Sequence, residues 1–495
     1  MSFVRLGIGL AGWAILSLGA ALRAQDDAKD EIVVVKAGRI LTVSGEDIKD
    51  GIIVIRNGKI EAVGTAVDYP YGAKVIDAKD LTVAPGFINP FSRAMPLAGA
   101  GPATKFGETF EADPEAFKGM VQSGYTVLGL APTGMGIAGR SLILRTYADD
   151  SKGLIVTDEG PLAAGFNNPA AEKQVIIGLL KQAQAEIDKV EKARKDWEAK
   201  KKAADEAAKK AAEEAAKKGP TPVPGPQPAP GPTPTPTPQP GPGPQPTPQP
   251  GPGPQPTPQP GPGPAPASQP AVPDKFVPPP INPALQPLVD LLQNKAGSTV
   301  TVEIGANPYN MWGGGTIMGG GIYLHWTDVT KDFSFAHGFV LRNPNVETDN
   351  PFVVFPETDA VKVTGEMGKE KRIVAIYPNV NHHPFTKDKY NLGLKLHQAG
   401  CRVVYLPERE GPGDYANMLG NLARMVKAGF PKREALKTVT LNAADLLGLG
   451  ARFGSIQAGR DAHLVFLTGD PLSYDTRVAK VMIDGKIVPV KPRLN

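Results

Sequence analysis

The side chains best suited to metal binding or proton transfer lie in the C-terminal part of the chain. The sequence has 495 residues and six histidines, and all of the histidines follow residue 324. Imidazole binds transition metals and takes up protons near neutral pH, so this distribution predicts where metal or acid–base chemistry would be found. The six are His325, His337, His382, His383, His397 and His463.

His382 and His383 have the most favourable position among these histidines. They follow a predicted strand at 372–377, and active sites of parallel α/β folds lie at the carboxyl ends of strands. Adjacent residues on an extended chain point in opposite directions, so one metal is not expected to bind both. His397 lies on a predicted amphipathic helix and is expected to be structural.

Two other patterns point to chemistry but fit it poorly. Gly134-Met-Gly-Ile-Ala-Gly139 matches the dinucleotide fingerprint, and Asp158 follows it. That fingerprint must open a helix whose N-terminus holds a pyrophosphate, whereas 141–147 is predicted as a strand. We interpret the glycines as a tight turn. Cys401 is the only cysteine and begins a predicted buried strand, so neither an internal disulfide nor a nucleophilic thiol is expected.

The elements that must position these residues begin and end with β-structure. Val, Ile and Leu dominate short segments bounded by turn residues, and Asn57-Gly58 is typical of a two-residue hairpin turn. Early and late β-segments predict one small β domain built from both ends of the chain, at 25–85 and 450–495. The predicted strands are 31–36, 51–56, 59–64, 75–77, 81–84, 462–467 and 478–488.

Between these ends the chain alternates between helices and strands. Predicted strands at 125–130 and 401–406 each follow a helix, at 117–124 and 389–398. Further helices are predicted at 416–428 and 432–446 from apolar spacing near 3.6. Helix-then-strand units predict an α/β fold with a parallel sheet or barrel at 86–171 and 284–449.

A long insertion interrupts this α/β region. A helix is predicted to begin at Pro169 with Asn168 as its cap, and its 172–218 part becomes almost entirely Ala, Lys and Glu. Residues 219–283 contain 30 of the 52 prolines, in a decapeptide repeat with proline at every second position. This spacing favours an extended, disordered spacer over the proline-rich ligands that need prolines three apart. The helix is interpreted as supported by its own alternating charges.

The N-terminus and the charge balance restrict location and partners. Arg5, the apolar run 6–22 and small residues near 20–24 predict an export signal at 1–24. The protein is therefore expected to be periplasmic or extracellular, or membrane-anchored if the signal stays uncleaved. A net charge of +4 is too balanced for a nucleic-acid binder. No stable membrane span is expected after cleavage.

Segments at both ends of the chain follow the pattern of a known family. They are 31–42, 51–64, 75–88, 434–449, 454–465 and Gly469-Asp-Pro-Leu. These segments resemble the amidohydrolase superfamily, and most of all its imidazolonepropionase- and dihydroorotase-like members. The resemblance implies a metal-dependent hydrolase of non-peptide carbon–nitrogen bonds, with a TIM-like (β/α) barrel beside a composite β-sandwich.

The chain departs from the pattern of this family at its metal site. The family has a His-x-His pair after Pro-Gly-Phe-Ile-Asp, where this chain has Asn89, Phe91 and Arg93. Phenylalanine has no donor atom, and arginine keeps a positive charge that repels a divalent cation. Later ligand positions of the family align with Glu303 and with Pro407-Glu408-Arg409. No cofactor is predicted, and zinc only if the altered site still binds it.

Three functions follow from these observations. The first, which we favour, is an exported protein with the amidohydrolase fold that has lost metal-dependent catalysis and keeps its barrel mouth for a small-molecule ligand. The second is an active hydrolase with an altered mononuclear or metal-free centre. The third is a spacer or interaction protein that works through its helix and proline repeat. The catalytic candidates for the second are His337, His382, His383, Glu303 and Glu408.

Overall fold

The computed structural model divides into two compact units. One comprises Met1–Glu186 and Ile281–Asn495, and the other comprises Ile187–Pro280. The predicted export signal lies outside the described residues, as do His337 and His383. The structure describes residues 30–134, 136–165, 169–217, 273–293, 295, 300–304, 322–326, 364–365, 367–369, 371–382 and 387–489.

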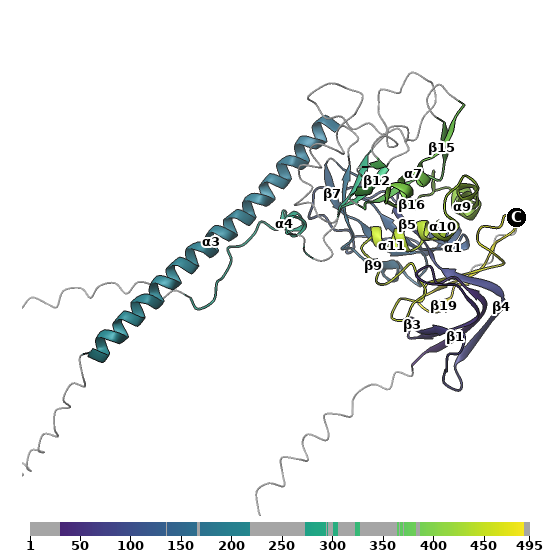
Figure 1. Ribbon diagram of the computed structural model, residues 1–495, viewed down its shortest axis with the longest axis horizontal. Coiled ribbons are helices and arrows are strands. Elements are labelled where there is room, and N and C mark those ends of the chain that lie inside the picture. The colour runs from purple at the N-terminus through teal and green to yellow at the C-terminus, as the bar shows by residue number, and fades with distance from the viewer. Residues whose placement is uncertain are drawn as a thin grey trace, which may run out of the picture. The chain divides into compact units, whose positions relative to one another are not determined.

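Strands from both ends of the chain form one seven-stranded sheet (Figure 1), in the order β19-β18-β17-β4-β1-β2-β3. β4 pairs in parallel with β1 and antiparallel with β17, so it joins the early strands to the late ones. The predicted early and late strands therefore share a sheet. A second sheet facing it, as in a sandwich, is not seen in the described part of the chain. The strands are β1 (Ile32–Ile40), β2 (Ile48–Arg56), β3 (Lys59–Gly64), β4 (Lys74–Pro85), β17 (Leu464–Leu467), β18 (Val478–Ile483) and β19 (Lys486–Ile487).

This sheet has a core on one face because its strands place aliphatic residues at alternate positions. Val33 and Val35 of β1 belong to the same buried cluster as Ile53 of β2 and Leu464 of β17. Each such side chain, when fully buried, contributes roughly 1.5–3 kcal/mol. The hairpin between β2 and β3 turns at Asn57, which has a φ of 50°, and its neighbouring glycine, which has a φ of 77°. The predicted two-residue turn is thus confirmed.

Two further sheets form the middle of the fold. The smaller has the order β5-β6-β8-β9 and the larger the order β16-β13-β12-β11-β10-β7. Three neighbouring pairs are parallel, namely β5–β6, β10–β11 and β13–β16, as the α/β prediction requires. The strands are β5 (Phe87–Ser92), β6 (Tyr125–Leu130), β7 (Ile137–Arg140), β8 (Leu142–Arg145), β9 (Ile155–Thr157), β10 (Leu162–Gly165), β11 (Val300–Ile304), β12 (Ile322–Trp326), β13 (Ile373–Ile376) and β16 (Arg402–Tyr405).

These two sheets share one hydrophobic core. Phe91 of β5, Ala375 of β13 and Val404 of β16 lie in a single buried cluster with Ala443 of α11 (Leu441–Leu446). Among the described residues, no strand pair links the two sheets, so the predicted TIM-like barrel is not seen as a closed ring. β12 also runs antiparallel between β11 and β13, which departs from an all-parallel barrel.

The predicted helix at 432–446 is divided into three short helices. They are α10 (Lys432–Ala435), a 3₁₀ helix at Leu436–Val439, and α11. The hydroxyl of Thr438 donates to the carbonyl of Ala435, and that of Thr440 donates to the carbonyl of Leu436. Threonines that bond back to the preceding turn bend helices, which explains the difference. The other short elements are a 3₁₀ helix at Pro114–Phe117, α1 (Lys118–Gln122), α2 (Ser151–Leu154), α4 (Gln286–Leu292), β14 (Val380–His382), β15 (Lys389–Asn391), α7 (Leu392–Ala399), α8 (Pro412–Ala416) and α9 (Met418–Lys427).

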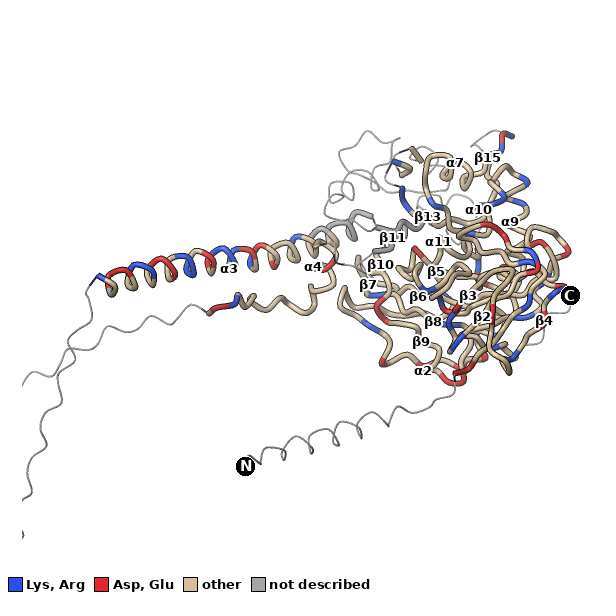
Figure 2. The backbone as a smooth tube through the Cα atoms, turned by 60° about the horizontal axis from the view of Figure 1, so that its bottom comes forward, with Lys and Arg blue, Asp and Glu red and all other residues tan. Residues whose placement is uncertain are grey.

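The long helix α3 spans Pro169–Lys217 and begins at the predicted proline. Leu180 and Ile187 in its first half are buried, as the early apolar spacing predicts. From Glu198 onward its described side chains are exposed, apart from that of Lys201. Figure 2 shows basic and acidic residues alternating along this half. Alternating charges at helical spacing stabilise a helix that lacks a packed face.

Within the smaller unit, residues 273–280 lie along α3. The indole N–H of Trp197 donates to the carbonyl of Pro273 at 2.9 Å, and its ring lies 5.9 Å from that of Phe276. The ammonium group of Lys189 donates to the carbonyl of Pro280 at 3.2 Å. The later residue of this segment thus contacts the earlier residue of the helix, so the segment runs antiparallel to α3. The proline repeat before it lies outside the described residues.

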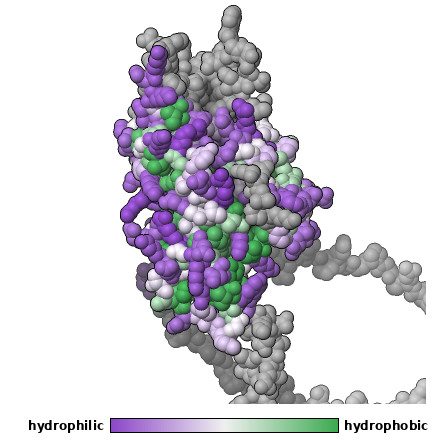
Figure 3. Space-filling view, turned by 90° about the vertical axis from the view of Figure 1, so that its right-hand side faces the viewer, coloured by the Kyte–Doolittle hydropathy of each residue, from purple (hydrophilic) through white to green (hydrophobic). Residues whose placement is uncertain are grey.

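The surface is mixed in character on the face shown in Figure 3. Hydrophobic residues there lie interspersed with hydrophilic ones. The exposed aromatic side chains of Tyr71 and Tyr474 belong to separate loops. Within the described ranges, none of the helices has the length and apolarity that crossing a membrane requires.

A buried histidine links the seven-stranded sheet to β8 through a carboxylate. The Nε2 atom of His463 lies 2.9 Å from Asp484, and the guanidinium of Arg145 lies 3.1 Å from the same carboxylate. Burial alone would raise the pKa of Asp484, but the hydrogen bond from His463 and the nearby positive charges lower it below 3.8.

We expect this carboxylate to contribute stability above pH 3.8 that is lost as the pH falls through its native pKa. Asp484→Asn should therefore destabilise the protein at pH 6 and have a shrinking effect as the medium is acidified below about pH 4. Urea unfolding at several pH values measures this. A destabilisation that is the same at every pH would assign the effect to packing.

Candidate functional site

The end of β5 is the place where the resemblance implies a metal site. All six residues of β5 are buried. Phe91 is 6% exposed and belongs to the core shared by the two central sheets. Arg93 is exposed, and its guanidinium carbon lies 5.5 Å from the centroid of the Phe91 ring. The two side chains at the His-x-His positions thus form a hydrophobic and cation–π contact.

A carboxylate from the loop after β16 reaches the end of β5. Glu410 accepts a hydrogen bond from the Ser92 hydroxyl at 2.6 Å and one from the backbone N–H of Arg93 at 2.9 Å. It also accepts one from the hydroxyl of Tyr415 at 3.1 Å. Glu410 has a φ of 53°, an uncommon value outside glycine that marks a tight reversal of the chain. This reversal turns its side chain back towards β5.

Asn89 completes the network from the interior of β5. Its amide nitrogen donates to the Tyr415 hydroxyl at 3.2 Å, and its amide oxygen accepts from the backbone N–H of Phe91 at 3.2 Å. Asn89 is 0% exposed and Tyr415 is 2% exposed. We call Asn89, Ser92, Glu410 and Tyr415 the polar network. It joins β5 to α8 and to the loop after β16.

The hydroxyl groups of Tyr415 and of its neighbour Tyr125 stay protonated. Burial raises the pKa of Tyr415 far above its usual value, and the nearby Glu410 carboxylate raises it further. Burial likewise raises the pKa of Tyr125, whose ring packs edge-on against that of Tyr415 with 4.8 Å between centroids. Tyr415 therefore acts as a hydrogen-bond donor to Glu410 across the physiological range.

The donor set at the end of β5 does not fit a divalent metal. Zinc sites need about three protein ligands with free lone pairs. Phe91 has none, and the amide and carboxylate oxygens of Asn89 and Glu410 already accept hydrogen bonds from neighbouring groups. Within the ranges that the structure describes, no group of three or more His, Cys, Asp or Glu side chains is arranged to hold a metal ion.

The other candidates from the sequence lie on different elements or loops. Glu408 is exposed, and it is Glu410, two residues later, that reaches β5. Glu303 lies on β11 opposite Tyr323 of β12. His382 pairs with Lys389 in the small β14–β15 hairpin. The structure places Glu408, Glu303 and His382 on separate elements.

The remaining histidines lie away from the polar network wherever the structure describes them. His325 pairs with Thr301 on β11 and with Ile373 on β13. His397 is on α7, as predicted, with its ring 5.5 Å from that of Phe430. His463 binds Asp484 at the seven-stranded sheet.

Cys401 is expected to be inert in the folded protein. Burial raises the pKa of its thiol from 9.0 to about 12, so the native thiolate population falls about 1000-fold. Labelling with a thiol-reactive disulfide at pH 8 should therefore be slow in buffer and fast in denaturant. Equal rates in the two conditions would contradict the buried position of this thiol.

Sequence reasoning missed Glu410 and Tyr415 because both depend on the shape of one loop. The segment Pro407-Glu-Arg-Glu-Gly-Pro-Gly-Asp contains two glutamates, and nothing local distinguishes which one turns inward. The one usable signal is Gly411-Pro412, which starts α8 and forces a reversal just after Glu410.

Parts of the sequence match a known family and one characterised relative. Residues 339–488 match the model of the amidohydrolase family. The amidohydrolase tasK of Hapsidospora irregularis is 46% identical over 93 residues, which are 19% of this chain. The match spans only 9% of that longer protein.

The chain also aligns with solved structures. The crystal structure of an amidohydrolase from Thermotoga maritima MSB8 aligns with 93% of this chain and 100% of its own, with a TM-score of 0.50 at 17% identity. An adenosine deaminase from Xanthomonas campestris, crystallised with bound zinc, aligns over 94% of both chains with a TM-score of 0.40 at 12% identity.

Proposed function

We propose that this chain is an exported member of the amidohydrolase superfamily, whose family model matches residues 339–488, and that its barrel mouth binds a small ligand without metal-dependent hydrolysis. The family acts as a hydrolase through metal ions that activate water. In this chain Phe91 and Arg93 occupy the positions of the family's His-x-His pair, and their side chains lie in a cation–π contact. The protein would then retain the shape of a hydrolase of non-peptide carbon–nitrogen bonds and use it for binding.

The polar network is the observation that carries this proposal. Metal hydrolases need an open coordination position from which a metal-bound water attacks. Here the carboxylate of Glu410 accepts three hydrogen bonds, from Ser92, Arg93 and Tyr415. Glu410 thus serves as a cross-link between β5 and the loop after β16.

The proposal also covers the barrel and the β-sandwich that the resemblance implies. We infer that the two central sheets are the two parts of one interrupted barrel, because Phe91 and Val404 meet in one core. The hydrogen bonds that Ser92 of β5 and the backbone N–H of Arg93 donate to Glu410 then hold the two edges together where strand pairing is missing. The seven-stranded sheet would form one layer of the composite β-sandwich.

Metal content and activity test the proposal together. Protein purified without chelator should contain far less than one zinc ion per chain by mass spectrometry. It should show no chelator-sensitive turnover of cyclic amides or N-acyl amino acids. One or two tightly bound zinc ions, with activity that a chelator abolishes and zinc restores, would overturn the proposal and favour the active hydrolase.

A matched pair of variants separates metal loss from misfolding. Phe91→Leu keeps an apolar side chain in the core, whereas Phe91→His restores one donor of the family pair. If the polar network excludes metal, neither variant should bind zinc more tightly than the wild type. Zinc binding by Phe91→His alone would show that the other ligands are still available.

Export and the insertion have separate tests. N-terminal sequencing of secreted protein should find a start near residue 25, and an intact N-terminus in the membrane fraction would indicate an anchor.

We propose that α3 and the proline repeat act as a spacer. Deletion of residues 172–283 should then leave ligand binding by the larger unit intact, while loss of the cellular role would favour the interaction function.

A further inference from the structure

A cleft of about 710 Å³ lies beside the seven-stranded sheet, away from the polar network. It is bounded by the loop 41–47 after β1, by α10 with the 3₁₀ helix that follows it, and by the turn 470–472. Leu41, Leu436 and Leu472 provide apolar surface within it. Its volume is in the range of small-molecule sites.

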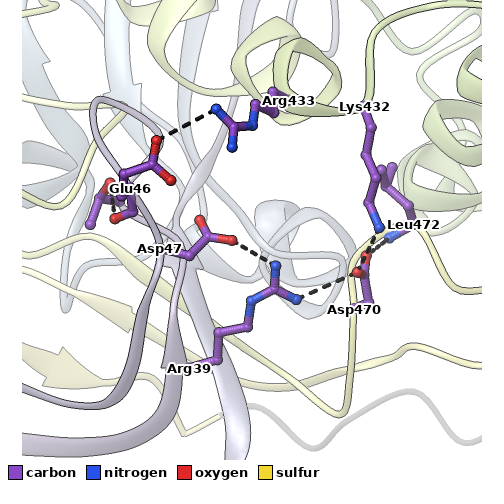
Figure 4. A network of polar contacts seen from close by, with 8 residues as sticks. Arg39, Glu46, Asp47, Lys432, Arg433, Asp470 and Leu472 are labelled. Carbon is purple, nitrogen blue, oxygen red and sulfur yellow. Dashed lines mark hydrogen bonds and ion pairs between the residues drawn. The ribbon is translucent and has the colours of Figure 1, made fainter.

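The two walls of this cleft carry opposite charge. Figure 4 shows Glu46 and Asp47 on the loop side, facing Lys432 and Arg433 on the α10 side. The other two charged residues of the helical wall, Glu434 and Lys437, bind each other at 2.8 Å. The cleft is therefore close to neutral overall, with anionic side chains on the loop side and cationic ones on the helical side.

Three connected ion pairs hold the charged side chains at the base of the cleft in place. Arg39 lies 2.6 Å from Asp47 and 3.5 Å from Asp470, and Lys432 lies 3.2 Å from the same Asp470 oxygen. Burial would raise the pKa of Asp470, but the Leu472 N–H and the two cations lower it. Asp470 therefore stays ionised and holds the side chains of Arg39 and Lys432 in place.

The rim differs from the base because its ion pair is loose. Arg433 and Glu46 are 3.5 Å apart, and both side chains are 85% exposed. Exposed pairs of this kind are worth about 0–1 kcal/mol, so a ligand that offers each partner a better contact can separate them. Arg433 and Glu46 can therefore separate while the three connected ion pairs below them stay intact.

The loop that carries the anionic wall is held in a strained conformation. Val43 lines the cleft with a φ of 68°, an outlier for a β-branched residue. The Thr42 hydroxyl accepts from the Gly45 N–H at 3.0 Å and donates to the Glu46 carbonyl at 3.2 Å. These bonds fix the loop, and strain of this kind concentrates at binding sites.

We propose that this cleft binds a zwitterionic amino-acid derivative, with its carboxylate on Arg433 and its ammonium group on Glu46, while Lys432 and Asp47 keep their ion pairs with Asp470 and Arg39. A purely anionic ligand would be repelled by the loop wall, and a purely cationic ligand by the helical wall. A zwitterion satisfies both walls at once, and an aliphatic side chain would contact Leu436 and Leu472. The site is independent of the polar network.

Isothermal titration of the whole protein with the dipeptide Gly-Leu tests this. N-acetyl-Gly-Leu lacks the ammonium charge, and Gly-Leu amide lacks the carboxylate. Each blocked analogue should bind about tenfold more weakly than Gly-Leu, the cost of one lost charge-assisted contact. Equal affinity for the three compounds, or no saturable binding of any, would overturn the proposal.

Two rim variants then assign the ends of the ligand. Arg433→Gln should weaken Gly-Leu binding several-fold and remove the preference for Gly-Leu over its amide, while the preference over the acetylated compound remains. Glu46→Gln should show the converse pattern. Lys105→Gln removes an exposed ion pair with Glu159 elsewhere and should change nothing. Unchanged preferences in both rim variants would place the ligand outside this cleft.

Discussion

Replacing Tyr415 by alanine is expected to lower the free energy of unfolding by about 3–5 kcal/mol, as for other large buried aromatic residues. Tyr415 is 2% exposed, packs against Tyr125 and bonds to both Asn89 and Glu410. Its removal leaves a cavity and takes one hydrogen-bond partner from Asn89 and one from Glu410. Chemical denaturation followed by circular dichroism measures the change.

Tyr415→Phe separates the hydroxyl group from the ring. It keeps the packing and should cost about 1–2 kcal/mol through the lost hydrogen bonds. Tyr474, which is 83% exposed, provides the control, and Tyr474→Ala should stay within about 0.5 kcal/mol of the wild type. If Tyr415→Ala cost no more than Tyr415→Phe, the ring would not be packed as described and the network would lose its support.

Gly454→Ala is expected to destabilise the protein by about 2–4 kcal/mol, although it adds a single methyl group. Gly454 has a φ of 86°, and a Cβ atom there would lie 2.7 Å from the Cα atom of Leu441. Backbone strain and close contact therefore act together. Thermal or denaturant unfolding measures the loss.

Gly420→Ala is the matched control for this substitution. Gly420 lies inside α9, and an added Cβ atom would meet nothing within 4 Å. Alanine is the better helix former by about 0.5–1 kcal/mol, so this variant should be more stable than the wild type. Two glycine-to-alanine changes with the same sign would show that the surroundings of Gly454 are more open than the structure has them.

The seven-stranded sheet was the most predictable part of the fold because its signals are local. The apolar runs of β1 and β2 and the Asn57 turn identify strands without knowledge of their partners. The arrangement of the central strands was not predictable in this way. Whether β12 runs parallel or antiparallel to β11 depends on chain direction, which strand composition does not record.

The sequence predicts that the metal-binding histidines are lost from the candidate site, but it does not predict the polar network found there. Phe91 and Arg93 reveal the lost donors by residue type alone. Glu410 becomes important only through its positive φ and the reversal before α8, which bring a residue 317 positions away to Arg93. Such long-range contacts leave no periodic pattern in the sequence.

The central position of β4 has a consequence for how the chain is made. Leu464 of β17 pairs with Pro85 of β4, so β4 keeps an open edge until residue 464 has been synthesised. At typical ribosomal rates, about 380 further residues take roughly 20–80 s. During that time an unpaired hydrophobic edge invites association with other chains. A chaperone that covers this edge until β17 is made would prevent such association.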